Sequence, residues 1–179
     1  SRKQVEENKQ TILTAAGRLF RERGFDAVTV TDIMKSAGLT HGGFYGYFKS
    51  KDDLIAQTLA ELKIENDAAK NDVVAQIERY LSPEHRDNFA SGCPLAALAA
   101  ETIRQSEPAR DEMSARLQQQ IAQLSEAMDD RDAQASRRAA IGSWSAMVGA
   151  LILARMTADS AFSDEILGET AAWLAEKQR

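Results

Sequence analysis

The sequence predicts an all-α protein, and three observations support this fold class. The chain of 179 residues contains only three prolines and ten glycines and is rich in residues that favour helices. Its 44% apolar content is enough for a hydrophobic core. No alternation of β-branched residues is long enough to suggest a sheet. We therefore expect about nine helices.

The N-terminal segment predicts two helices separated by a short link. Apolar residues recur at helical spacing over residues 7–23, and Gly24 follows as a C-terminal cap. Thr29 begins a capping-box-like start of a second helix, which Gly38 stops. The second helix is therefore short, and the first one braces it.

A third helix is expected over residues 41–49, with Thr40 as its N-cap, and Ser50 opens a fourth helix. Only three residues, starting at Gly38, separate the second and third helices. Two short helices joined by a tight turn after a bracing helix are typical of a helix-turn-helix module. An ordinary helical hairpin within a bundle is the alternative.

The rest of the chain predicts a larger helical body. Pro94 and Pro108 both suit the first turn of a helix. The longest apolar run, residues 144–154, is too short to cross a membrane, which needs roughly 20 residues. Helices are expected over residues 54–81, 94–105, 108–128, 131–156 and 164–177.

Charge and cysteine content limit the functional classes. Residues 1–54 carry nine Lys and Arg against seven Asp and Glu, net +2, whereas the remainder carries thirteen against twenty, net −7. This asymmetry favours an anion-binding head on an acidic body. The single cysteine, Cys93, excludes an internal disulfide framework, and no leader opens the chain, so we expect a cytoplasmic protein.

The stretch THGGFYGYF, residues 40–48, places three glycines where a helix is expected. Phe44 and Phe48 are four residues apart and share a face that would pack on the scaffold. A glycine within a helix costs about 1 kcal/mol relative to alanine, so a separate demand must favour the small residues on the other face. A DNA major groove supplies that demand, because a bare helix can approach base edges and phosphates closely.

Two groups of residues around this helix are suited to contact DNA. The hydroxyl and ammonium groups that fit phosphates belong to Tyr45, Tyr47 and Lys51. The helix start, where side chains or backbone can reach bases, consists of Thr40, His41, Gly42 and Gly43.

The run TVTDIMKSAGLTHGGFYGYFKSKDDL, residues 29–54, closely resembles the signature of TetR-family transcriptional regulators. The resemblance implies a helix-turn-helix DNA-binding domain over residues 1–54 and a helical regulatory and dimerisation domain over residues 55–179. It implies a homodimeric repressor that binds a palindromic operator and is released by a small-molecule inducer. The residues matching DNA-contacting positions of the family are Thr29, Thr40, His41, Gly42, Gly43, Tyr45, Tyr47 and Lys51.

The expected helix over residues 131–156 carries a track of small residues that permits close approach of another helix, and the final helix carries an apolar stripe. The resemblance implies that they pair with their copies in a four-helix dimer interface, whereas a core within one chain is the alternative. The expected interface residues are Gly142, Ala146, Gly149, Ala150, Leu153, Ile166, Leu167, Thr170, Trp173 and Leu174.

An inducer cavity is expected between the helices of the body, and simple core is the alternative, and the commoner role, for each proposed residue. Its expected lining is Phe89, Cys93, Met113, Leu117, Trp144 and Met147. Cys93 precedes a proline suited to begin a helix, a place where the pKa of a thiol can be lowered. Repression controlled by electrophiles or oxidants through this thiol is therefore an alternative function.

The sequence contains no recognisable enzymatic motif. The two histidines, His41 and His85, are far apart, and no HExxH, phosphate loop or GxSxG elbow is present. We expect no metal, no cofactor and no catalytic activity, with a small helical enzyme that uses carboxylates as the alternative. The expected partners are double-stranded operator DNA, a second copy of the chain and a small-molecule inducer, without a membrane.

Overall fold

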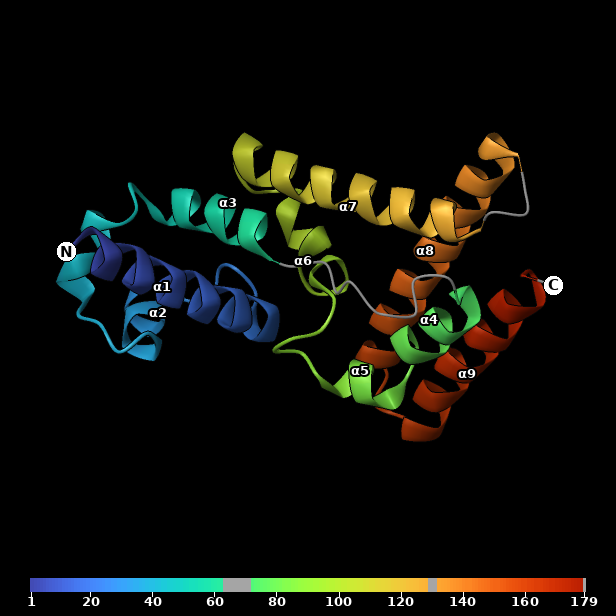
Figure 1. The fold of residues 1–179 in the computed structure, drawn as a ribbon. Helices are drawn as coiled ribbons and strands as arrows, with labels where there is room; N and C mark the ends of the chain where they lie inside the picture. Colours follow the sequence, from blue (N-terminus) through green and yellow to red (C-terminus); the bar gives the residue numbers. More distant parts are fainter. Residues whose placement is uncertain (63–71, 129–131, 179) are drawn as a thin grey trace. The chain divides into compact units, whose positions relative to one another are not determined.

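A computed structural model describes residues 1–62, 72–128 and 132–178 (Figure 1). Over these ranges the protein consists of nine α-helices and one short 3-10 helix, without strands, which confirms the predicted fold class. The helices are α1 (Arg2–Arg23), α2 (Val30–Ser36), η1 (His41–Gly46), α3 (Lys51–Glu61), α4 (Val73–Tyr80), α5 (Pro83–Asp87), α6 (Pro94–Thr102), α7 (Glu107–Ala127), α8 (Ala133–Met156) and α9 (Ser160–Glu176).

The chain divides into two compact units. The first contains residues 1–63 and 89–115, and the second contains residues 64–88 and 116–179. Helix α6 therefore belongs to the same unit as the N-terminal helices. The functional boundary at residue 54 stays a prediction, because a packing unit and a functional domain need not share their limits.

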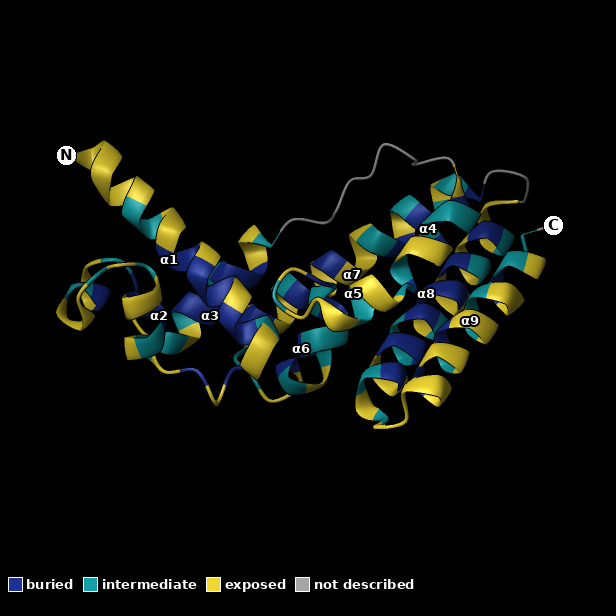
Figure 2. Cartoon of the chain, turned by 90° about the horizontal axis from the view of Figure 1, so that it is seen from below, coloured by how far each residue is buried: buried dark blue, intermediate teal, exposed yellow. Residues whose placement is uncertain are grey.

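The core of the first unit lies where α1 packs against α2, α3 and α6. Phe20 and Phe25 are fully buried, and their rings meet edge to face with centroids 5.1 Å apart. Ile33 and Met34 of α2 and Leu54 of α3 are also fully buried. Figure 2 shows that burial of α1 is confined to its second half, since the N-terminal turns are largely exposed.

Predicted helix ends are confirmed at three positions. Gly24 and Gly38 adopt φ angles of 83° and 71°, which favour glycine. After α2, the Leu39 N–H donates to the Met34 carbonyl oxygen at 2.9 Å, which satisfies a carbonyl at the helix end. At the start of α3, Ser50 Oγ accepts from the Asp53 N–H at 3.0 Å.

The expected α-helix over residues 41–49 is wrong in length and winding. The segment is a 3-10 helix, with the Gly43 N–H donating to the Thr40 oxygen at 3.1 Å and the Tyr47 N–H to the Phe44 oxygen at 2.9 Å. Thr40 occupies the N-cap position, but its side chain makes no capping hydrogen bond. The three glycines lower the α-helix propensity of this segment, so the tighter 3-10 winding can replace the expected α-helix.

The expected helix over residues 54–81 is not observed as one element. Helix α3 ends at Glu61 and α4 begins at Val73, while residues 63–71 lie outside the described residues. The short α5 was not expected, and Ser82 Oγ caps it by accepting from the His85 N–H at 3.2 Å. The four later helices agree with α6 to α9 within a few residues, although the expected start at Arg131 is also outside the described part.

In the second unit, α8 packs along α9, α4 contacts α9 and α5 contacts α8 (Figure 1). The turn between α8 and α9 is fixed by Ser163 Oγ, which donates to the Ala154 oxygen at 2.7 Å. Arg86 of α5 donates to Asp164 at 2.6 Å and to Ser163 at 2.9 Å. Arg155 donates to the Arg86 oxygen at 2.9 Å, so α5 is attached to both long helices.

Helix α8 is long and apolar enough to cross a membrane by length and composition alone. Its 24 residues include an 18-residue window of mean hydropathy 1.4, of which 39% is buried within the structure. Core helices of other proteins meet the same criterion. Its packing against α9 and α5 accounts for the buried side.

Candidate nucleic-acid interface

The 3-10 helix η1 is held to the head by two phenylalanines. Phe44 and Phe48 are 1% and 2% exposed, and their rings stack with centroids 5.6 Å apart. This confirms the prediction that they share an inward face. With three glycines in or near its turns, η1 owes its position to this burial rather than to helix propensity.

The opposite face of η1 is open. The Tyr45 side chain is 73% exposed, and His41, Gly42 and Gly46 are also exposed. A Cβ atom added at Gly42 or Gly46 would have no atom of the described residues within 4 Å. Packing within the described part of the protein therefore does not require glycine at either position.

Tyr47 joins the start of α1 to η1. Asn8 Nδ2 donates to the Tyr47 hydroxyl oxygen at 2.9 Å, and Asn8 Oδ1 accepts from Gln4 Nε2 at 3.0 Å. The tyrosine proton is still a donor in this arrangement. Lys9 lies 5.9 Å from the centroid of the Phe48 ring. The sequence alone does not indicate Asn8, because its partner is 39 residues away.

Lys51, the first residue of α3, is anchored by the main chain. Its Nζ donates to the Phe25 carbonyl oxygen at 2.6 Å. An ammonium group carries three N–H donors, so this single bond leaves donors for a phosphate. The Lys51 side chain is half-buried. Its hydrogen bond to the Phe25 oxygen fixes the direction of the ammonium group.

Thr29 and Asp32 form a complete capping box at the start of α2, as predicted. Thr29 Oγ1 accepts from the Asp32 N–H at 3.1 Å, and Asp32 Oδ2 accepts from the Thr29 N–H at 2.9 Å and from its hydroxyl at 2.7 Å. These hydrogen bonds hold the pKa of Asp32 below its usual value. A phosphate contact from Thr29 would compete with Asp32 for the hydroxyl proton.

The capping box predicts an acid-sensitive head. Because the pKa of Asp32 is lower in the folded state, its stabilisation is complete above the unfolded pKa of about 3.9 and is lost as the pH falls through the folded value. We expect thermal stability to fall more steeply in the wild type than in Asp32→Asn when the pH is lowered from about 7 to about 3. Parallel curves for the two proteins would contradict this role.

His41 is tied to α2 rather than to its own helix. Its Nδ1 shares a hydrogen bond of 3.1 Å with Thr31 Oγ1, and both residues are exposed. Thr40 is exposed beside them. The pair places a hydroxyl and an imidazole where α2 and η1 begin. Thr31 was not among the residues predicted from the sequence.

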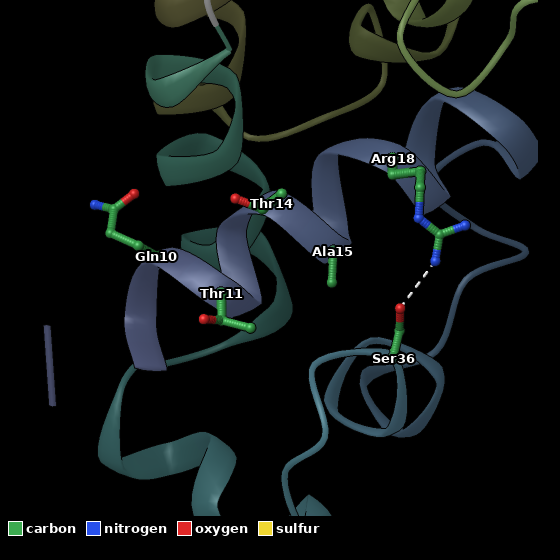
Figure 3. A pocket seen from close by; sticks show the side chains of 6 residues that line it. All are labelled: Gln10, Thr11, Thr14, Ala15, Arg18 and Ser36. Carbon is green, nitrogen blue, oxygen red and sulfur yellow. Dashed lines mark hydrogen bonds between the residues drawn. The ribbon is translucent and has the colours of Figure 1, made fainter. Parts of the chain in front are cut away.

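The first unit also has an open hollow on α1 and α2 (Figure 3). On its edge, Arg18 Nη2 donates to Ser36 Oγ at 2.9 Å, and Arg18 pairs with Glu22 at 3.2 Å. None of the residues expected to line an inducer cavity contributes to it. Its lining consists of Gln10, Thr11, Thr14, Ala15, Arg18 and Ser36.

The residues expected around an inducer fall in both compact units. In the first unit, Phe89 is exposed, Met113 is buried and Cys93 is half-buried at the N-cap of α6. In the second unit, Leu117 is exposed, whereas Trp144 and Met147 are buried. The Trp144 ring lies 5.1 Å from that of Tyr80, and its buried indole N–H has no hydrogen-bond partner among the described residues.

The residues expected at a dimer interface fall into two sets within the second unit. Ala150, Leu167 and Leu174 are buried in the chain itself and leave little surface for a partner. The others have exposed or partly exposed positions on α8 and α9: Gly142, Ala146, Gly149, Leu153, Ile166, Thr170 and Trp173.

Both parts of the chain match models of known protein families. Residues 12–58 match the model of "Bacterial regulatory proteins, tetR family", and residues 68–166 match that of "Transcriptional regulator LmrA/YxaF-like, C-terminal domain". The HTH-type transcriptional regulator HbdR of Aromatoleum sp. (strain CIB) is 34% identical over 84 residues, which are 47% of this chain and 35% of the relative. The match thus spans about a third of that relative's length.

A second relative and a solved structure extend the similarity. The HTH-type transcriptional repressor NemR of Escherichia coli (strain K12) is 28% identical over 136 residues, or 69% of this chain and 68% of NemR. The crystal structure of reduced E. coli NemR superposes with a TM-score of 0.77 at 22% identity and covers 95% of this chain and 96% of that one. A TetR-family regulator from Agrobacterium tumefaciens gives 0.75 at 21% identity, covering 94% and 97%. These structures share the fold.

Proposed function

This chain belongs to the TetR family of bacterial regulatory proteins, and we propose that it represses transcription as a homodimer bound to a palindromic operator. Each head would place η1 in the major groove of one half-site. Binding at a promoter would block access of the transcription machinery in the cytoplasm.

One observation supports DNA binding most strongly: η1 turns a nearly bare face outward, while its Phe44 and the Phe48 that follows it are buried. In and after η1 the chain carries donors suited to phosphates: the exposed Tyr45, the Tyr47 hydroxyl that Asn8 holds and Lys51 Nζ that the Phe25 oxygen holds. With few side chains near the groove, His41, Thr40, the backbone at Gly42 and Gly43, and DNA shape would share the reading of sequence.

Selection of bound fragments from random duplex DNA tests this function. We expect an inverted repeat whose half-sites are about one helical turn, or a multiple of it, apart. Binding to the selected duplex should weaken steeply with salt, and a scrambled duplex of equal length should bind at least about a thousandfold more weakly. Equal affinity for the selected and scrambled duplexes would exclude operator recognition.

We further propose that the exposed stripes of α8 and α9 form the dimer interface. Leu153 and Trp173 are 49% and 52% exposed, a large apolar area for a free surface. A Cβ atom at Gly142 or Gly149 would meet no described atom within 4 Å, and the same holds for Gly168 of α9. Such small outward-facing residues suit the close approach of helices from a second copy.

Leu153→Asp should therefore separate the two copies. A charge buried at an apolar contact is unfavourable, so we expect the dimer dissociation constant to rise at least about tenfold. Light scattering at micromolar concentration should give twice the chain mass for the wild type and a shift toward one chain mass for the variant. Ile103→Asp, at a residue exposed on the first unit, is the control and should stay dimeric. A monomeric wild type would end this proposal.

Control of the repressor would come from a small molecule bound in the helical body. In the second unit, the buried indole N–H of Trp144 has no hydrogen-bond partner among the described residues and can donate to a ligand acceptor. The inducer can shift binding only by its difference in affinity between the DNA-bound and free forms. Compounds that release the operator should therefore bind free protein more tightly than the complex. Equal binding to both would rule a compound out as inducer.

A further inference from the structure

The end of α6 makes a polar contact with the turn that follows α1. Glu101 Oε2 accepts from the Phe25 N–H at 2.8 Å, across 76 residues of sequence. Both residues belong to the first compact unit, and α6 packs against α1. The contact joins a charged acceptor to a main-chain donor, which is stronger than a neutral hydrogen bond.

Gly24 provides the space for this carboxylate. A Cβ atom at Gly24 would overlap both carboxylate oxygens and Cδ of Glu101, so any side chain there would push the carboxylate away. The φ angle of 83° at Gly24 also favours glycine independently. Two features of the turn thus fit the close approach of Glu101.

The same turn residue holds Lys51. The Phe25 N–H is bound by Glu101 and the Phe25 carbonyl oxygen accepts from Lys51 Nζ, so the two bonds flank one Cα atom. Phe25 itself is fully buried, which fixes this residue between them. Displacing the Phe25 main chain would therefore move the anchor of the Lys51 ammonium.

The other end of α6 is also attached to α1. Arg21 Nη1 donates to the Gly92 oxygen at 3.4 Å, directly before the N-cap residue Cys93, and Arg21 Nε donates to the Gly17 oxygen at 3.0 Å. With both of its ends attached, α6 has a defined position against α1. Helix α6 therefore holds the Glu101 carboxylate in place beside the turn that follows α1.

We propose that Glu101 is a positioning residue for DNA binding, which acts through the Phe25 main chain to direct Lys51 toward a phosphate. This role rests on the proposed operator binding. The carboxylate would not touch DNA, and its negative charge alone would weaken DNA binding. Its contribution is to the placement of a cation 50 residues earlier in the sequence.

Two conservative variants separate position from charge. Glu101→Gln keeps an acceptor oxygen at the same reach, and we expect its affinity for the selected duplex to stay within about twofold of the wild type. Glu101→Asp keeps the charge but is one methylene shorter, and we expect about a tenfold loss. The exposed Glu107→Gln serves as the charge control. A purely electrostatic role predicts the opposite order, with Gln tighter and Asp unchanged.

Two measurements test whether Glu101 acts through Lys51: the salt dependence of DNA binding, and the effect of Glu101→Asp in a protein that already carries Lys51→Ala. Loss of its phosphate contact in Glu101→Asp should reduce the slope of log affinity against log salt by about 0.9 per head, which lower stability alone would not do. In a Lys51→Ala background, Glu101→Asp should have no further effect. A tenfold loss that persists there, or a Gln variant as weak as Asp, overturns the inference. A wild type that binds no selected duplex overturns the proposed function instead.

Discussion

Replacement of Tyr45 by alanine should reduce affinity for the selected operator by about a hundredfold with little loss of thermal stability. The ring is 73% exposed, so its removal opens no cavity in the core. A hydroxyl donating to a phosphate contributes about 1.5 kcal/mol or more, and a dimer loses two such bonds, or about 3 kcal/mol. Fluorescence anisotropy and thermal unfolding measured on the same samples provide both quantities.

Two further variants make this result specific. Tyr45→Phe removes only the hydroxyl and should reproduce most of the loss, while the salt slope stays unchanged because no cation is removed. Ile103→Ala removes an equally exposed large side chain, also 73% accessible, from the end of α6 and should bind normally. Normal affinity of Tyr45→Ala would remove this residue from the interface.

Local spacing predicted the part of the site that depends on a single helix. The four-residue interval between Phe44 and Phe48 was sufficient to predict their shared buried face, because neighbours at that interval lie together in helical turns. The three-residue interval between Thr29 and Asp32 likewise predicted the capping box, which the structure contains. The winding of η1 was not predictable in this way: η1 ends at Gly46, and the two phenylalanines come together through an α-type turn after it, in which the Phe48 N–H donates to the Phe44 oxygen at 3.1 Å.

The contacts that fix the candidate functional groups involve residues far apart in the chain. The sequence did not predict these contacts. Tyr47 is bound by Asn8 and the Phe25 turn by Glu101, across 39 and 76 residues. Periodicity specifies which face of a helix is buried, but it does not specify the register between two helices. Lys51 was predicted from the sequence to contact a phosphate, whereas its anchor on the Phe25 carbonyl required the folded chain.

The proposed interface assigns stability and DNA recognition to opposite faces of η1. Inward side chains are expected to determine whether the six-residue helix forms, and outward groups are expected to contact DNA. Substitutions on the two faces should therefore give different combinations of stability and affinity. Loss of affinity without loss of stability identifies an outward residue, as expected for Tyr45, and loss of both identifies an inward one.

Phe44→Ala should eliminate operator binding by unfolding the segment that carries the interface. The side chain is 1% exposed, stacks on Phe48 and meets Tyr45 edge to face with centroids 5.2 Å apart. Truncating a buried phenylalanine costs about 3–5 kcal/mol, which corresponds to a fall in melting temperature of roughly 10 °C for a chain of this size. Circular dichroism on heating and anisotropy titration should both show the loss.

Phe44→Leu is the matched control for this variant, because it keeps an apolar side chain of similar reach. We expect a loss of about 1–2 kcal/mol and measurable operator binding. The glycine-rich η1 has little helical stability of its own, so its order depends on the volume filled at Phe44 and Phe48. Phe44→Ala with unchanged melting temperature and affinity would show instead that the segment is held by its backbone and by the Asn8 contact to Tyr47.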